Sequence, residues 1–211
     1  MGSFNAVKAA KSVTKVIREN SEFGENSCLP SQKTKEALSS SGMLSLWRPE
    51  ILGGHECDPV SYTKAAEIIA TADTSAAWIM HGVSASWLVL RSATNELVDE
   101  IINSAETPLL TDTYNKAMKA DRIPGGYSIT GETPFASGCK IADWIAHTAL
   151  YEEKLLLVFH PANTLEIRND WNPIGIRGSA SNTVAAKNIF VPEHRVIALS
   201  IEVVPTLPFG G

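Results

Sequence analysis

The sequence predicts an α+β protein whose first half is helical and whose second half is built of strands. Up to about residue 106, the hydrophobic residues recur with the helical period of 3.6. After Pro108 they alternate with a period of two, in short runs separated by Gly, Pro, Asn and Asp. Helical and strand patterns do not alternate along the chain, so we expect two packed subdomains and no series of βαβ units.

The first half carries the signals of five helices. Residues 5–20 repeat apolar side chains on one helical face. Pro30 and Ser31 begin a second helix, and Gly42 can end it. A loop at 46–59 precedes a third helix. The apolar residues of that helix are Tyr62, Ala65, Ala66, Ile68 and Ile69.

The fourth helix is expected at residues 75–90, with Asp73 or Thr74 as its N-cap. It is apolar nearly all round, and a helix without a polar face is buried on most sides. Thr94 caps a short fifth helix. The strand half contains six runs that we expect to form strands: "PLLTDTY", "GGYSITGETPF", "DWIAHTALY", "KLLLVFH", "NTLEIRND" and "NTVAAKNIFV".

Composition narrows the class of protein. The chain has 211 residues, a hydrophobic content of 44% and a formal net charge of −5, with Lys and Arg scattered along it. This disfavours a surface for nucleic acid or anionic membrane. No apolar run approaches the roughly 20 residues that span a bilayer, and the N-terminus lacks an apolar signal core. Three cysteines without metal or redox spacing favour a reduced, cytoplasmic setting.

The cluster His55, Glu56, Cys57 and Asp58 is the strongest candidate for metal ligands in the sequence. These residues are consecutive, and they lack the i, i+4 or C-x₂-C spacings that make ligands converge. We therefore expect a solvated loop and no metal site.

Four motifs follow one another in an order typical of a known family: "PEILGGHECDP", "AAEIIATADTSAAW", "GGYSITGETPFASGCKIADW" and "WNPIGIRGSASNTVAAKNIFVPEHRV". Together they resemble the acyl-CoA dehydrogenase superfamily, and within it the flavin-dependent monooxygenase branch. That branch includes the oxygenase components of p-hydroxyphenylacetate hydroxylases, dibenzothiophene monooxygenase and amino-sugar nitrososynthases. The resemblance covers roughly residues 1–200.

The resemblance implies a domain organisation. Residues 1–106 would form an N-terminal helical domain and residues 107–200 a middle β-barrel domain. Residues 201–211 would then link to a C-terminal four-helix bundle, which this chain lacks. Apolar surface that the bundle would cover is expected to promote self-association.

By the same resemblance, the segment "GETPFASG" lies along a flavin. Phe135 would stack near the isoalloxazine ring, and the Ser137 hydroxyl would reach its polar edge and serve catalysis. Thr111 or Thr113 would bond to the flavin pyrimidine. The residues alone leave three alternatives open: a core position for Phe135, a turn position for Ser137, and ordinary strand positions for the two threonines.

The resemblance also implies a substrate pocket. Trp171 matches a tryptophan that forms part of the active-site wall in the monooxygenases and lies near the flavin. Some relatives use a histidine of the fourth helix to orient or deprotonate substrate, which suggests a catalytic role for His81. In this sequence Ser84 or Ser86 occupies the usual position of that histidine, so we include both serines in the predicted pocket. A core tryptophan and a buried core histidine remain the alternatives.

The function implied is that of a two-component monooxygenase, which uses reduced FAD or FMN and O₂ to oxygenate a small organic substrate. Its partners would be a separate flavin reductase, a chain that supplies the C-terminal domain, and further copies of itself in a dimer or tetramer. Nucleic acid and membrane are not expected. An acyl-CoA dehydrogenase with tightly bound FAD is the first alternative. A non-catalytic remnant that binds flavin weakly is the second.

Overall fold

The computed structural model describes residues 4–199, so the predicted linker at 201–211 lies outside the described residues. The helices are α1 (Ala6–Glu19), α2 (Ser21–Ser27), α3 (Gln32–Ser40), α4 (Pro59–Ala70), α5 (Thr74–Val89) and α6 (Asn95–Ile102). Short 3₁₀ turns lie at Met43–Ser45, Glu50–Leu52, Leu90–Ser92, Ala162–Thr164, Arg177–Ser179 and Glu193–Arg195. All five expected helices are confirmed, and α2 is additional. It escaped prediction because Phe23 is its only large apolar residue, which leaves no periodic pattern.

The predicted helix caps are present. Asp73 caps α5 by accepting a hydrogen bond from the Ser75 backbone N–H at 2.7 Å. Thr94 caps α6 in the same way through Leu97 N–H at 3.3 Å. Gly42 follows α3 with a left-handed φ of 78°, a conformation that favours glycine.

The strands form one seven-stranded sheet. They are β1 (Leu110–Ile123), β2 (Gly126–Ala136), β3 (Trp144–Tyr151), β4 (Lys154–Pro161), β5 (Glu166–Ile167), β6 (Asn182–Pro192) and β7 (Val196–Ala198). Their order in the sheet is β5-β6-β2-β1-β3-β4-β7. The β1–β3 pair is parallel and the other pairs are antiparallel. Apolar side chains of β1, β2, β3, β4 and β6 pack together, so the sheet curves around a core of its own.

Two strands differ from the sequence pattern. β1 continues to Ile123 through a polar stretch, because the Pro124–Gly125 turn pairs it with β2. The predicted strand at 163–170 shrinks to the two residues of β5, which pair with the neighbouring β6.

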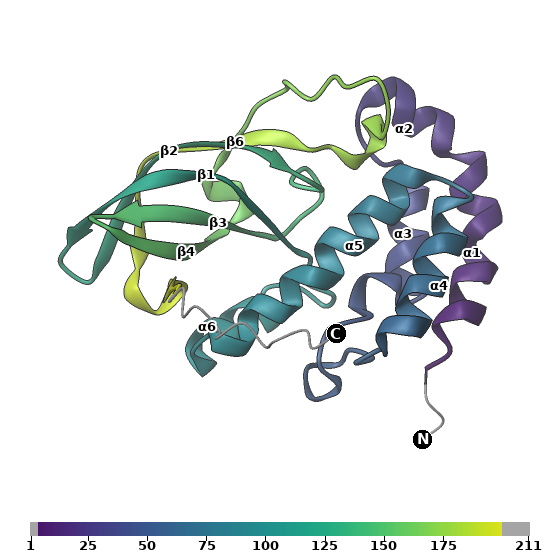
Figure 1. Cartoon of the computed structure of the whole chain (residues 1–211), viewed down its shortest axis with the longest axis horizontal. Coiled ribbons are helices and arrows are strands. Elements are labelled where there is room, and N and C mark those ends of the chain that lie inside the picture. Colours follow the sequence, from purple (N-terminus) through teal and green to yellow (C-terminus); the bar gives the residue numbers. More distant parts are fainter. Residues whose placement is uncertain (1–3, 200–211) are drawn as a thin grey trace, which may run out of the picture.

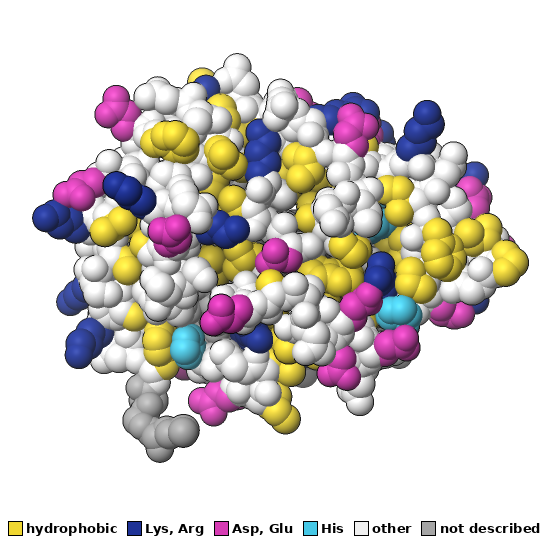
Figure 2. Space-filling model, turned by 180° about the vertical axis from the view of Figure 1, so that it is seen from behind, with side chains coloured by type: hydrophobic (Ala, Val, Ile, Leu, Met, Phe, Trp, Pro, Cys, Tyr) yellow, Lys and Arg dark blue, Asp and Glu magenta, His cyan; other side chains and the backbone are white. Residues whose placement is uncertain are grey.

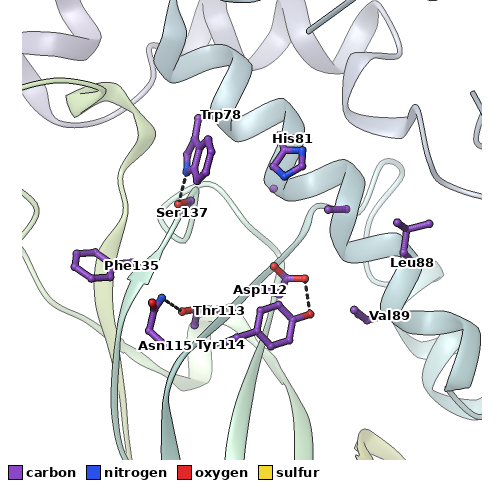
Figure 3. Close-up of a pocket in the computed structure, with 12 residues that line it drawn as sticks. Trp78, His81, Leu88, Val89, Asp112, Thr113, Tyr114, Asn115, Phe135 and Ser137 are labelled. Atoms are coloured by element: carbon purple, nitrogen blue, oxygen red, sulfur yellow. Dashed lines mark hydrogen bonds between the residues drawn. The ribbon is translucent and has the colours of Figure 1, made fainter. Parts of the chain in front are cut away.

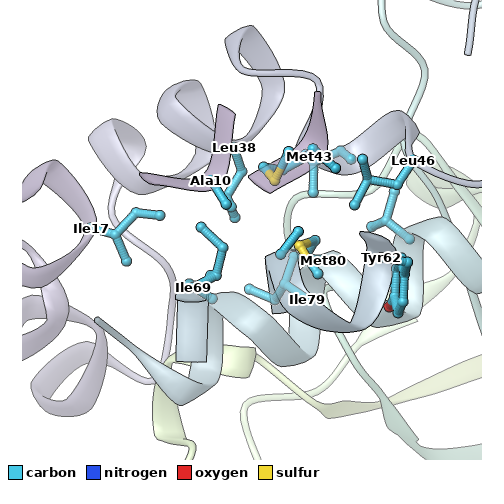
Figure 4. Close-up of a cluster of buried hydrophobic side chains, with 14 of the residues drawn as sticks. Ala10, Ile17, Leu38, Met43, Leu46, Tyr62, Ile69, Ile79 and Met80 are labelled. Carbon is cyan, nitrogen blue, oxygen red and sulfur yellow. The ribbon is translucent and has the colours of Figure 1, made fainter. Parts of the chain in front are cut away.

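A second core fills the helical half. Its largest side chains come from α1, α3, α4, α5 and the turn after α3 (Figure 4): Ile17, Leu38, Met43, Leu46, Ile69, Ile79 and Met80. Helix α5 lies between the other helices and the sheet (Figure 1). As expected, most of it is buried. One strip remains exposed, formed by Trp78, His81 and Leu88, which follow each other at helical spacing.

The surface carries charges of both signs. In the view of Figure 2, acidic and basic side chains are interspersed, with hydrophobic side chains between them. Within residues 4–199, no helix has the length and apolar character needed to cross a membrane. Over the same residues, no three His, Cys, Asp or Glu side chains come together as a potential metal site.

Candidate functional site

A cavity of about 530 Å³ lies between the exposed strip of α5 and the sheet (Figure 3). Helix α5 contributes Trp78, His81, Gly82, Ala85, Leu88 and Val89; β1 contributes Asp112, Thr113, Tyr114 and Asn115; and the end of β2 brings Phe135 and Ser137. The volume and the mainly apolar and aromatic lining are typical of small-molecule sites. An extended planar aromatic ring would suit such a lining.

The segment that carries Phe135 and Ser137 is fixed by hydrogen bonds to its backbone. The Thr111 hydroxyl donates to the Ser137 carbonyl oxygen at 2.5 Å, and the Thr113 hydroxyl donates to Pro134 at 2.9 Å. Both threonines are buried, and of the two only Thr113 lines the cavity. In this structure the hydroxyls predicted to contact flavin are therefore used to hold the segment in place.

Phe135 has an unusual conformation for an aromatic residue. Its φ is 62°, in the left-handed region, and its side chain is 55% exposed. The ring stands edge-on to Trp171, with 6.1 Å between the ring centroids. The exposure rules out the alternative that Phe135 is a core residue. Strained conformations of this kind cluster at functional sites, where the surrounding structure holds them.

The Ser137 hydroxyl belongs to a chain of hydrogen bonds. It accepts from the indole N–H of Trp78 at 2.8 Å and shares a second bond of 2.8 Å with the Ser181 hydroxyl. Ser181 in turn shares a bond of 2.7 Å with Ser179. Both of these serines are buried. Ser137 is thus a fixed hydroxyl at the cavity wall, with more structure around it than a turn residue needs.

His81 lies in the exposed strip of α5 and lines the cavity, which corrects the alternative of a buried core histidine. Its Nδ1 lies 2.8 Å from the Tyr62 hydroxyl. Tyr62 stacks on Trp47 with a centroid distance of 3.9 Å. Burial raises the pKa of Tyr62 to about 12, so its hydroxyl is protonated at neutral pH. It donates to Nδ1 when that nitrogen carries no proton and accepts from Nδ1 when it does.

Three predicted pocket residues do not line the cavity. Ser84 is buried against the helical core, where its hydroxyl donates to the Met43 carbonyl oxygen at 3.4 Å. Ser86 is also buried and donates to the Gly82 carbonyl oxygen at 2.7 Å. Trp171 lies behind Phe135, and its indole N–H donates to the Arg177 carbonyl oxygen at 3.0 Å.

Sequence reasoning missed Asp112, Tyr114 and Trp78. The Tyr114 hydroxyl donates to Asp112 Oδ2 at 2.9 Å. Burial raises the pKa of Asp112, while the hydrogen bond from Tyr114 and the nearby His81 act in the opposite direction. Burial, and secondarily the Asp112 charge, raises the pKa of Tyr114. The period of two in "LLTDTY" was the available signal, because it turns Asp112 and Tyr114 to the face opposite the threonines.

Comparisons with known proteins are consistent with this geometry. No family model matches the chain. It is 26% identical over 187 residues to the flavin-dependent monooxygenase oxygenase subunit HsaA of Rhodococcus jostii (strain RHA1), covering 86% of this chain and 49% of that protein. It is 28% identical over 169 residues to the oxygenase component of the FADH₂-dependent resorcinol hydroxylase of Rhizobium sp. (strain MTP-10005), covering 76% and 41%.

A solved structure shows the same fold. XiaF from Streptomyces sp., determined in complex with FADH2 and glycerol, matches with a TM-score of 0.87 and 28% identity. The match covers 92% of this chain and 50% of XiaF. The chain therefore spans about half the length of the relatives it matches. By sequence and fold, it is a homologue of the oxygenase subunits of flavin-dependent monooxygenases with an acyl-CoA dehydrogenase-like fold.

Proposed function

We propose that the chain is part of the oxygenase component of a two-component monooxygenase, in which a reduced flavin and O₂ oxygenate a small aromatic substrate. The flavin, FAD or FMN, would place its isoalloxazine ring at the Phe135 and Ser137 end of the cavity. The substrate would occupy the end formed by His81, Asp112 and Leu88. The names of the relatives, and the FADH2 in the XiaF structure, support this assignment.

The hydrogen-bond chain at Ser137 is the observation that carries the proposal. A hydroxyl has one donor and two acceptor sites. Either hydroxyl of each serine pair can be the donor. In the arrangement in which Ser179 donates to Ser181 and Ser181 to Ser137, the acceptor sites of Ser137 are used by Ser181 and by the Trp78 indole. In that arrangement the Ser137 O–H is free to donate to a ligand in the cavity. A bound flavin supplies the reducing electrons for oxygen activation, and the protein supplies orientation and exclusion of water.

The surroundings of Ser137 support a planar ligand. Phe135 presents its ring at the cavity wall and is backed edge-on by Trp171. Trp78 contributes a second aromatic surface from α5 and is 48% exposed. These rings can cover an isoalloxazine by offset or edge-to-face contacts. Gly138, which follows Ser137, has a left-handed φ of 74° that favours glycine at that position.

The proposed partners follow from the same assignment. A separate reductase would supply the reduced flavin, and additional protein, as a further segment or a second chain, would complete the site. Copies of the chain would also associate through exposed apolar side chains of the helical half, such as Phe23, Ile51 and Val60. Sedimentation equilibrium tests the association, and a monomer at high concentration would contradict it.

Anaerobic titration with reduced FAD and reduced FMN tests the main proposal. We expect saturable binding of a reduced flavin, weak binding of the oxidised form, and O₂-dependent hydroxylation of a phenol by the assembled system. A protein that retains oxidised FAD through purification would instead be a dehydrogenase. A protein that binds neither form would be a non-catalytic remnant.

A further inference from the structure

One carboxylate lies in the cavity, and no Lys or Arg is among the described residues that line it. That carboxylate belongs to Asp112, the only acid among those described residues. The rest of the lining is mainly aromatic and apolar, with the neutral polar residues Thr113, Asn115 and Ser137 and the imidazole of His81. Because Asp112 is partly buried, solvent screens its charge less than that of an exposed carboxylate, and it interacts more strongly with a polar group of a ligand.

The position of Asp112 in the fold directs its side chain into the cavity. Asp112 lies on β1 between two inward-facing threonines, so its side chain points away from the sheet core and toward α5. Figure 3 shows it beside Tyr114, below His81. Tyr114 occupies one position on Oδ2 at 2.9 Å, and the nearby Ser86 gives its proton to Gly82. An ionised carboxyl has about four acceptor positions, so Asp112 can accept a further bond from a ligand.

The cavity therefore favours one class of ligand over two others. A neutral aromatic with an O–H or N–H group can stack on the ring walls and donate to Asp112. The same ring without a donor leaves the carboxylate desolvated and unmatched. A ring with a carboxylate of its own meets a like charge, and no described lining residue is a Lys or Arg that would offset it.

We propose that Asp112 determines substrate specificity by accepting a hydrogen bond from an uncharged aromatic substrate with an O–H or N–H donor, and by excluding aromatic carboxylates. Tyr114 is the positioning residue that holds the carboxylate. The inference rests on the proposed function in one respect, since it names the class of molecule that would enter the substrate end of that site.

The test measures binding of three probes to the full chain without flavin, by isothermal titration calorimetry at neutral pH. The probes are para-cresol, para-methylanisole, in which the donor is blocked, and para-hydroxybenzoate, which adds a negative charge. We expect para-cresol to bind about ten- to hundredfold more tightly than either of the others.

Variants of Asp112 assign the effect to this residue. Asp112→Leu should remove the preference for para-cresol over para-methylanisole. Asp112→Asn keeps the shape and removes the charge, so para-hydroxybenzoate should bind about tenfold more tightly than to the wild type. Asp121→Asn is the matched control, because Asp121 is exposed on the same strand and pairs with Lys119 at 2.8 Å, outside the cavity lining. It should leave the probe pattern unchanged.

Three results would overturn the inference: equal affinity for para-cresol and para-methylanisole, no para-cresol binding at millimolar concentration, or an unchanged pattern in a folded Asp112→Asn variant. Circular dichroism establishes the folding, and the Asn variant carries the test if the Leu variant does not fold. Reduced-flavin titration of the same proteins separates the two proposals. Flavin capture without the probe pattern refutes this inference alone, and the probe pattern without flavin capture refutes the proposed function alone.

Discussion

Phe135 combines two features that do not stabilise a folded chain, a half-exposed ring and a left-handed backbone. Such strain costs on the order of 1–3 kcal/mol. Phe135→Gly should relieve it, so we expect the free energy of unfolding to stay within about 1 kcal/mol of the wild type or to rise. Reduced-flavin affinity should fall, because the stacking ring is lost. Urea unfolding and anaerobic flavin titration measure the two effects.

Phe190 is the matched control for this change. It is 52% exposed on β6 and is not among the residues with positive φ. Phe190→Gly should therefore destabilise the protein by about 1 kcal/mol without affecting flavin binding. A large loss of stability in Phe135→Gly would mean that the ring is a packing element.

Ser137→Ala removes one hydroxyl and adds no bulk. A hydrogen bond to a charged ligand is worth roughly 1.5–3 kcal/mol, so reduced-flavin affinity or turnover should fall about ten- to hundredfold. The change also removes the acceptor of the Trp78 indole N–H. Because Trp78 is half-exposed, a water molecule can take the place of that acceptor. Ser128→Ala, at the other end of β2, is the control. Unchanged flavin affinity and turnover in Ser137→Ala would reduce Ser137 to a structural residue.

At the residue scale, the sequence placed some of the cavity well. Phe135 and Ser137 line the cavity, and a loop with an aromatic, a serine and glycines is a local signal that the sequence displays. Their contacts with a flavin remain predictions. Asp112 was missed because its significance depends on α5, a different element, covering that face of β1. The bond between Tyr62 and His81 was missed for the same reason, since the two residues lie on different helices.

At the element scale, the cap of α5 connects helix stability to the cavity. Asp73→Ala removes the acceptor of the Ser75 N–H and should lower the free energy of unfolding by about 1 kcal/mol. Trp78 follows one turn later, so the bond from Trp78 to Ser137 should loosen and hydrogen exchange at the start of α5 should rise. Reduced-flavin affinity should fall as well.

Asp58→Ala offers a matched comparison, because Asp58 caps α4 through Val60 N–H and Ser61 N–H, both at 3.0 Å. It should cost a similar free energy and increase exchange in α4, while flavin affinity stays unchanged. Equal losses of flavin affinity in both cap variants would contradict a specific connection between α5 and the cavity.

Elements with strong local signals were predictable, and those that depend on neighbours were not. Helices α1, α3, α4, α5 and α6 have apolar periods or caps of their own. Helix α2 lacks both, and its Gly24 packs against Gly178, which is distant in sequence. The division into domains at residues 106 and 107 remains a prediction.

At the scale of the whole molecule, two buried histidines give the fold a dependence on pH. His147 on β3 and His160 on β4 stack with ring centroids 5.0 Å apart, and neither Nε2 has a hydrogen-bond partner among residues 4–199. Burial lowers the pKa of His147 to about 4 and that of His160 to about 3, the latter also through His147 and Arg195. Both imidazoles are therefore neutral in the folded protein at pH 7.

The unfolded chain takes up these protons near the ordinary histidine pKa of about 6.5, and the folded protein does so only at much lower pH. The contribution to stability is thus present above about pH 6.5 and is lost as the pH falls toward the folded values. Between pH 7 and pH 5 we expect a loss of roughly 2 kcal/mol for each histidine. Urea unfolding at the two pH values measures it, and the loss should shrink in His160→Leu. The same loss in that variant would exclude His160 as a cause.

The pairing of β2 with β6 affects when the site forms during folding. It joins residues that are far apart in the chain, and Ser137 meets Ser181 just where this pairing ends. Closing a long loop delays such pairing during folding. We therefore expect the cavity to form late, after the amides of the helices and of the β1–β2 hairpin are protected from hydrogen exchange. Pulsed hydrogen exchange during refolding would show this as slow protection of the Gly138 N–H, which bonds to the Ser179 carbonyl oxygen at 2.8 Å. A nascent or partly folded chain would then carry stable helices but no place for a ligand, so ligand binding would report on completion of the whole sheet.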